Sequence, residues 1–331
     1  DVARTAEGRW VVLADQTDAA IGGGYVVASR VALSHGLADL FIACHTRRLA
    51  GFYATVQASL QARCPRDDGR IVVLAPGPDS PTYFSHAYLA RYLGYTLAQA
   101  DDLTVRDDTL FLKTLDGLQR VDLLLRKQPA PTLDPLFLPG SGLSGVAGLV
   151  HAARRGKVAL ANAIGAGLAQ NRAVAPWSRT LARKLLGEDL LLDEQETLWL
   201  GDPAARAAVT AAPGRWWIAP THGRNDPGAP IQTHDLATLT AEQRERLQIH
   251  LAAEGWRHVA QAPVTFATTP TFEAGTLRPA PFAIRLFAAR SGDGFTVMPG
   301  GLVRLAGSAT GTALPNGFGS MDLWVTGATA E

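Results

Sequence analysis

The chain has 331 residues, of which 47% are hydrophobic and 18% are charged, so it is long enough for about two domains with substantial cores. Its formal net charge of +1 at pH 7 argues against a nucleic-acid partner, because binding a polyanion needs clustered Lys and Arg side chains. No run of about 18 apolar residues occurs, and we therefore expect no membrane-spanning helix and no membrane partner.

Cysteine and histidine are sparse and scattered along the chain. The two cysteines, Cys44 and Cys64, fall in no Cys-x-x-Cys or Cys/His ligand spacing, so a structural zinc site is not expected. Such sparse cysteines indicate a reducing compartment, and we predict a cytoplasmic location, although the two could also pair. The chain begins at Asp1 without a Met or a leader, and we interpret it as the later part of a longer polypeptide.

The N-terminal region contains a strand, a glycine-rich loop and helices. Residues 8–14 form a short apolar strand, and residues 15–25 form a turn-rich loop with three consecutive glycines. These glycines either let the backbone approach another group closely or make a mobile connection. Over residues 26–60, apolar residues recur at helical spacing with one break near residues 43–46, which predicts two helices.

The next region has the pattern of an α/β domain. An apolar strand at residues 70–75 ends in a Pro/Gly loop and is followed by a helix over residues 82–94, where His86 is expected to be packed. Apolar strands at residues 121–126 and 157–163 continue the alternation, which predicts a mainly parallel sheet. Ligands bind at the carboxyl ends of such strands. No G-x-G-x-x-G follows the first strand, so a dinucleotide or sugar-nucleotide enzyme is poorly supported.

The second half predicts an α+β region with an antiparallel sheet, and it includes a charged helix capped by Thr240. Residues 283–306 contain two apolar strands around a Ser-Gly-Asp-Gly turn, then a Pro-Gly-Gly break and a further strand. Arg285, Arg304 and, farther along, Asp322 interrupt this apolar segment. A buried arginine is costly unless it meets an anion, so these residues are site candidates. Alternatively, they are ordinary residues of the sheet.

Several sequence blocks, taken in order, resemble the circularly permuted type 2 ATP-grasp family over nearly the whole chain. The matching blocks are Val11-Val-Leu-Ala-Asp-Gln-Thr, Leu74-Ala-Pro-Gly-Pro, Tyr83-Phe-Ser-His-Ala-Tyr-Leu-Ala-Arg-Tyr-Leu-Gly, Leu103-Thr-Val-Arg-Asp, Val158-Ala-Leu-Ala-Asn-Ala-Ile-Gly-Ala-Gly, Leu186-Gly-Glu, Gly201-Asp-Pro and Met298-Pro-Gly-Gly-Leu-Val-Arg-Leu-Ala. Each block is short, and the specificity of the match comes from their order and spacing.

The resemblance implies an α/β and α+β fold, with a Rossmann-like α/β domain beside circularly permuted ATP-grasp lobes that hold ATP and Mg²⁺. The implied division is an N-terminal strand and helices that complete the ATP-grasp core (1–65), the Rossmann-like domain (66–192) and an ATP-grasp α+β region (193–331). Such enzymes activate a carboxylate as an acyl phosphate and couple it to an amine or thiol of a small molecule or peptide. The permutation implies that the strand at residues 10–14 lies beside the C-terminal hairpin, so that Asp15 and Asp322 share one site.

Carried over residue by residue, the resemblance also implies a Mg-ATP site, because such a site needs oxygen ligands for the metal and cations for the phosphates. The implied metal ligands are Asp15, Gln16 and Asp322. The implied catalytic residues near the phosphates are Arg285 and Arg304. The implied cofactor-binding residues are Arg126, Arg224, Gly300 and Gly301.

Several positions depart from the family pattern. Ala14 replaces a glutamate and Gln16 an asparagine in the first block, while Ala219 and Met321 each stand where the family has a lysine. Removing one preorganised electrostatic group of this kind costs on the order of 10²–10³ in rate. The sequence therefore predicts an eroded nucleotide and metal site, and it makes ATP and Mg²⁺ binding by this chain doubtful.

Two hypotheses remain open for the function. The favoured one is a catalytically inactive relative that serves as a scaffold or regulatory partner, with the α-helical domain that often accompanies this family as its partner. The alternative is an active Mg-ATP-dependent ligase that forms an acyl-phosphate intermediate.

Overall fold

The computed structural model describes residues 1–137, 145–222, 234–315 and 319–327. The chain forms two compact units, each assembled from segments that are distant in sequence. Unit 1 comprises Asp1–Gln16, Leu168–Arg285 and Val303–Ser320, and unit 2 comprises Thr17–Gly167, Leu286–Leu302 and Met321–Glu331. The predicted domain boundaries at residues 65 and 192 come from the family resemblance, whereas the two units are defined by their compactness. The two divisions are of different kinds, so the domain boundaries stay a prediction.

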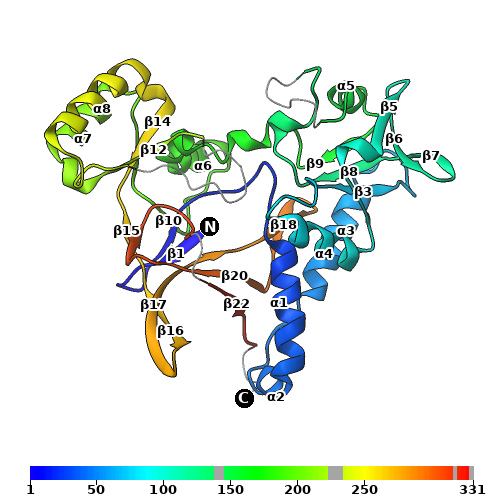
Figure 1. Cartoon of the computed structure of the whole chain (residues 1–331), viewed down its shortest axis with the longest axis horizontal. Helices are drawn as coiled ribbons and strands as arrows, with labels where there is room; N and C mark the ends of the chain where they lie inside the picture. Colours follow the sequence, from blue (N-terminus) through cyan, green and yellow to red (C-terminus); the bar gives the residue numbers. More distant parts are fainter. Residues whose placement is uncertain (138–144, 223–233, 316–318, 328–331) are drawn as a thin grey trace. The chain divides into compact units, whose positions relative to one another are not determined.

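Unit 2 is built around a parallel sheet, as the strand and helix alternation predicts. Its strand order is β4-β3-β8-β9, and every neighbouring pair is parallel. The strands are β3 (Ile71–Leu74), β4 (Thr96–Ala98), β8 (Leu123–Arg126) and β9 (Ala159–Ala161). All four residues of β3 are buried, which explains the uninterrupted apolar run in the sequence. Figure 1 shows β3, β8 and β9 side by side.

The helices of unit 2 pack beside this sheet and against one another. Their bounds are α1 (Gly23–Gly36), α2 (Ala38–Ala43), α3 (Ala50–Gln61), α4 (Tyr83–Leu93) and α5 (Leu149–Arg154). Three helices therefore occupy the region where the periodicity predicts two, because the chain breaks once more at Leu37. Val26, Phe52 and Leu89 join α1, α3 and α4 in one apolar cluster.

Two antiparallel elements complete unit 2. A three-stranded meander contains β5 (Leu103–Arg106), β6 (Thr109–Thr114) and β7 (Gly117–Arg120). The hairpin predicted around the Ser-Gly-Asp-Gly turn is confirmed as β18 (Ala288–Ser291) and β19 (Gly294–Val297). Cys44 and Cys64 are both free thiols, so they do not pair with each other.

Unit 1 contains a mixed sheet that joins the two ends of the chain. Its strands β10 (Asp193–Glu194), β2 (Trp10–Val12), β1 (Val2–Arg4) and β17 (Thr276–Arg285) are neighbours in that order, and β16 (Thr268–Glu273) also pairs with β17. β20 (Gly300–Leu305) and β22 (Ser320–Trp324) are each divided between the units, with residues 303–305 of β20 and Ser320 of β22 in unit 1. The strand near residue 10 was predicted to lie beside the C-terminal hairpin, but it pairs with β10 and β1 instead. β1, a strand not predicted from the sequence, is the one that pairs with β17.

A second, antiparallel sheet of unit 1 lies next to two helices (Figure 1). Its order is β11-β14-β12-β13, with β11 (Thr197–Trp199), β14 (His258–Gln261), β12 (Trp217–Pro220) and β13 (His234–Asp235). Residues of α7 (Pro203–Ala211) and α8 (Ala241–Glu254) share its apolar core. The predicted Thr240 cap is confirmed, because its hydroxyl accepts a hydrogen bond from the Gln243 amide.

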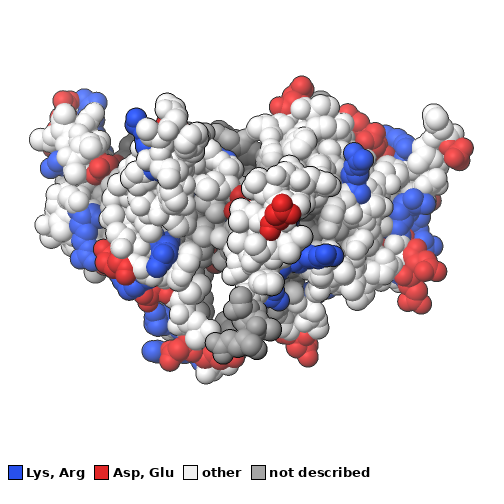
Figure 2. Space-filling view, turned by 90° about the horizontal axis from the view of Figure 1, so that it is seen from below, with Lys and Arg blue, Asp and Glu red and all other residues white. Residues whose placement is uncertain are grey.

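Charged side chains are mixed over the surface. Blue and red side chains are interspersed on the face shown in Figure 2, consistent with 31 Lys and Arg against 30 Asp and Glu in the sequence. Within the described ranges, no helix is both long enough and apolar enough to cross a membrane.

Candidate functional site

A polar pocket in unit 1 lies at the end of β2 and holds ionisable side chains. Its walls come from β2 and the residues that follow it, β10, β11, β14 and the 3₁₀ helix η4 (Arg172–Trp177). Its volume is about 430 Å³, including the part open to solvent. The polar side chains that line it include Asp15, Arg172, Ser178, Glu194, Gln195 and Gln261.

Glu194 and Asp15 form the acidic side of this pocket. The parallel pairing of β10 with β2 places Glu194 opposite Val12, three residues before Asp15. Burial raises the pKa of Glu194 above its ordinary value, and the nearby Asp15 carboxylate also raises it, against the lowering effects of a Ser178 hydrogen bond and of Arg179. Glu194 is half-buried and the Asp15 carboxylate near it is exposed, so a cationic group would relieve the repulsion between them.

Arg172 is a half-buried cation on the wall formed by η4. Asn171 caps this short helix by accepting a hydrogen bond from the Ala173 amide, which holds the segment in place. The Arg172 Nη1 donates to the Pro220 carbonyl at 3.2 Å, but the buried Nε has no hydrogen-bond partner. Burial also lowers the pKa of Arg172. Within the described part of the chain, no carboxylate forms a salt bridge with this guanidinium.

Gln261, on β14, brings an unpartnered acceptor to the pocket. Its side-chain Nε2 donates to Gln195 Oε1 at 3.2 Å and to Thr197 Oγ1 at 3.3 Å. Gln195 is held in turn because its own Nε2 donates to the Ala262 carbonyl. These bonds fix the amide of Gln261, which is only 2% exposed, and leave its Oε1 without a partner.

Asp15 and Gln16, two of the implied metal ligands, are exposed residues after β2, and Asp15 lines the pocket. The third, Asp322, lies in unit 2 with a fully buried side chain. Its Oδ2 accepts hydrogen bonds from Arg30 Nε at 2.5 Å and Trp324 Nε1 at 2.9 Å, and its Oδ1 accepts one from Arg30 Nη2 at 3.3 Å. This carboxylate is therefore engaged within its own unit. The common site of Asp15 and Asp322 stays a prediction.

Gly300 and Gly301, implied to contact the nucleotide, are buried residues of β20. A Cβ at Gly300 would lie 2.8 Å from Arg30 Nη2 and 2.9 Å from a methyl group of Leu49. The absence of a side chain at Gly300 therefore makes room for the arginine that pairs with Asp322.

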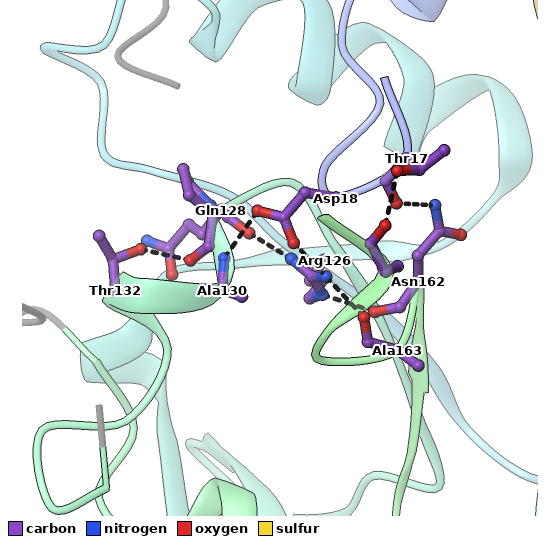
Figure 3. Close-up of polar contacts among 10 residues, drawn as sticks. Thr17, Asp18, Arg126, Gln128, Ala130, Thr132, Asn162 and Ala163 are labelled. Carbon is purple, nitrogen blue, oxygen red and sulfur yellow. Dashed lines mark hydrogen bonds and ion pairs between the residues drawn. The ribbon is translucent and has the colours of Figure 1, made fainter. Parts of the chain in front are cut away.

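Arg126, also implied to contact the nucleotide, is a buried structural anchor at the end of β8 (Figure 3). Its Nη2 donates to Asp18 Oδ1 at 2.6 Å and to the Ala163 carbonyl at 2.9 Å. Its Nε donates to the Asn162 carbonyl at 2.5 Å and its Nη1 to the Gln128 carbonyl at 3.0 Å. These contacts tie the loop after β9 and the segment around Asp18 to the carboxyl edge of the sheet.

The two implied catalytic arginines also have partners in unit 1. Arg285, at the end of β17, pairs with both oxygens of the Asp1 carboxylate at 2.7 and 2.8 Å, and burial lowers the pKa of Arg285 to about 10. Arg304, on β20, donates to the Ser320 hydroxyl at 2.7 Å and to the Pro315 carbonyl at 3.3 Å. Arg224 lies outside the described residues. Among the residues that are described, no group of three or more His, Cys, Asp and Glu side chains is arranged to hold a metal ion.

Residues 1–306 match the family model for circularly permuted ATP-grasp type 2 proteins. The chain belongs to this family. One uncharacterized protein of Mycobacterium tuberculosis is 32% identical over 327 residues, which is 98% of this chain and 36% of the relative. A second uncharacterized protein of the same species is 32% identical over 336 residues, 98% of this chain and 59% of the relative.

This chain therefore spans about a third of the first relative and about three fifths of the second. A crystal structure of a protein named as a gamma-glutamylcysteine synthetase from Methylobacillus flagellatus aligns with a TM-score of 0.42 and 14% identity, over 99% of this chain and 79% of that one. That similarity is too low to add to the family assignment.

The two positions where the family pattern has a lysine lie in regular strands of this chain. Ala219, where the family has a lysine, is 2% exposed on β12 and faces Val259 across the ladder to β14. Met321, at the other lysine position, lies on β22 and is 37% exposed. Both strands therefore form in this chain without the cations that the family pattern places on them.

The sequence analysis missed three pocket residues, Arg172, Glu194 and Gln261. Gln261 gave a signal, because it is a polar amide inside the apolar strand Val259-Ala-Gln-Ala-Pro-Val. Arg172 and Glu194 lie in segments without a clear hydrophobic period. Only the pairing of β10 with β2 and the contact of η4 with the end of β12 bring them to the pocket.

Proposed function

We propose that this chain is a circularly permuted ATP-grasp protein without Mg-ATP-dependent ligase activity, and that it acts as a scaffold or regulatory partner of an α-helical domain. The observation that carries the proposal is the burial and hydrogen bonding of the Asp322 carboxylate. This carboxylate is fully buried and hydrogen-bonded to Arg30 and Trp324, so binding a metal ion there would require breaking a buried ion pair.

The arginines implied to contact the phosphates support the same proposal. Arg126 uses its guanidinium on Asp18 and on three carbonyl groups, and Arg285 uses its own on both oxygens of Asp1. Stabilising a phosphoryl group needs cations aimed at the ligand in advance. These internal contacts engage two of the implied arginines, and Ala219 and Met321 provide no cation at the two lysine positions.

The proposal is tested by titrating the chain with Mg-ATP at millimolar concentrations in a calorimeter and by assaying ADP release. We expect neither heat of binding nor turnover. ATP turnover that is lost on Asp15→Ala and kept on Asp116→Ala would overturn the proposal. Both aspartates are exposed, so the two substitutions have comparable effects on folding, and Asp116 lies on the turn between β6 and β7, away from the pocket.

The alternative function, an active ligase, is favoured by one observation. The pocket combines Asp15 and Glu194 with Arg172, and carboxylates and a guanidinium are the groups that would hold Mg²⁺ and phosphate. An active ligase would release ADP only in the presence of a carboxylate substrate, with an amine or thiol as acceptor. The calorimetric titration distinguishes the two functions, because an active ligase would bind Mg-ATP even without its other substrates.

The scaffold role concerns a partner outside this chain. The relatives extend well beyond the matched region, since this chain spans only 36% of one and 59% of the other. We propose that an α-helical domain supplied by such additional sequence is the partner. Co-purification of this chain with that part of a relative, expressed as a separate protein, tests the interaction.

A further inference from the structure

The pocket of unit 1 carries opposite charges on different walls. Arg172 comes from η4, whereas Asp15 and Glu194 come from the adjacent strand ends of β2 and β10. We infer that this pocket binds a small zwitterion of the free α-amino acid class, with the ligand carboxylate on Arg172 and the ligand ammonium between Glu194 and Asp15. This inference goes beyond the proposed function, and it requires neither ATP nor a metal ion.

The carboxylate end follows from the unused edge of Arg172. Its Nη1 is held by the Pro220 carbonyl, whereas the buried Nε has no partner, so the edge formed by Nε and Nη2 is left for a ligand. A guanidinium edge matches the two oxygens of a carboxylate in a bidentate pair. Arg172 is half-buried and partly desolvated, and a bound carboxylate would offset the cost of that desolvation.

The ammonium end follows from three acceptors. The Glu194 and Asp15 carboxylates both line the acidic side of the pocket. The Gln261 Oε1 is a third acceptor, buried and without a partner, on the same pocket. An ammonium group has three donors and a positive charge, so it satisfies the amide oxygen and relieves the repulsion between the carboxylates.

The charge of the pocket selects against other ligand classes. Two carboxylates and one guanidinium give the three ionisable lining groups named here a net charge of about −1, which disfavours a polyphosphate. A bare divalent cation would use the carboxylates and leave the Arg172 edge empty. A zwitterion uses both walls, because its carboxylate pairs with Arg172 and its ammonium with the acidic side.

The test is a thermal-shift screen of the chain against the common amino acids, followed by calorimetry on the best ligand, without nucleotide or metal. We expect at least one amino acid to bind with a Kd of about 1 mM or lower. Its α-amide and its N-acetyl derivative each lose one charge, and each should bind about tenfold more weakly or worse.

Two protein variants test where the carboxylate and the ammonium group of the ligand bind. Arg172→Gln should weaken binding of the amino acid about tenfold while changing binding of its α-amide much less, because the amide has no carboxylate to lose. Glu194→Gln should weaken binding of the amino acid about tenfold while changing binding of its N-acetyl derivative much less, because that derivative has no ammonium group to lose. Arg183→Gln is the control, since Arg183 is an exposed arginine that pairs with Asp189 outside the pocket.

Three results would overturn the inference. The first is no binding of any amino acid by the folded chain at about 10 mM, and the second is equal binding of the charged and blocked forms. The third is binding of Mg²⁺ alone or inorganic phosphate alone that depends on Glu194 or Arg172 and excludes the amino acid. Mg-ATP turnover would refute the inactive-scaffold proposal without affecting this one, so the two can fail separately.

Discussion

His86 is packed inside unit 2 with a side chain that cannot easily carry a charge. It is 1% exposed on α4, and its Nε2 has no hydrogen-bond partner. Burial, together with the positive charge of Lys127, lowers the pKa of His86 to about 3. The same principle holds at Arg126, which is tolerated in the interior because Asp18 and three carbonyl groups receive its donors.

The lowered pKa of His86 predicts a specific loss of stability in acid. Below the ordinary pKa of about 6.5 the unfolded chain takes up a proton at His86 that the folded chain refuses. This group therefore lowers the free energy of unfolding as the pH falls from about 6.5 toward 3, by at most about 1.4 kcal/mol per pH unit. In urea unfolding between pH 7 and 4, His86→Gln should show a shallower pH dependence than the original chain.

His35, an exposed histidine on α1, provides the control for this measurement. His35→Gln should keep the original pH dependence. If the two variants have the same pH profile, His86 is not the group whose protonation opposes folding.

At the scale of elements, helices α1 and α4 approach each other at a glycine. A Cβ on Gly24 would lie 1.8 Å from the Ser85 carbonyl oxygen, so only glycine fits at this contact. The three consecutive glycines in the sequence left open whether they serve close approach or mobility. For Gly24, the structure shows close approach of two helices within the protein.

This contact predicts opposite effects of two alanine substitutions in the same helix. Gly24→Ala forces α1 and α4 apart and should reduce the free energy of unfolding by about 1–3 kcal/mol or more. Gly36→Ala, at the end of α1, meets no atom within 4 Å and should be neutral or stabilising by up to about 1 kcal/mol. Chemical denaturation of both variants checks the difference, and equal effects would contradict the packing argument.

At the scale of the whole molecule, the N-terminal strand is completed by residues almost 300 positions away. Val2 pairs with Ile284 and Ala3 with Ala283, and Ala3 is fully buried in a cluster with Leu13 and Phe266. β1 separates β2 from β17 in this sheet, so the N-terminal strand folds together with residues 276–285 of the same unit. A strand of three residues has no stability of its own, and its pairing to β17 is what orders it.

Charging this strand on its buried face should therefore disrupt the sheet of unit 1. Ala3→Asp buries a carboxylate without a partner and should cost several kcal/mol of the free energy of unfolding. Arg4→Asp on the exposed face of the same strand should change it by about 0.5 kcal/mol or less. Hydrogen exchange at Ala283 and Ile284 measures the effect locally, and unchanged protection in Ala3→Asp would contradict the assigned register.

The local features of the fold were predictable from the sequence. The buried strand β3, helix α4, the Thr240 cap and the hairpin of β18 and β19 all follow from short-range patterns of apolar spacing and turn residues. The family was recognisable for a related reason, since the order of short blocks survives the substitution of single site residues.

Only the tertiary structure decided which charged residues are internal partners and which face a pocket. Arg30 and Asp322 are almost 300 residues apart, as are Arg285 and Asp1, and a pattern of spacing contains no information about such pairs. Arg172, Glu194 and Gln261 lie in three separate segments and meet because strands and a short helix pack together. The sequence by itself determined the elements and the family, because these depend on near neighbours along the chain. The partner of each buried charge was decided by folding, because burial brings together groups from distant segments and makes an unpaired charge costly.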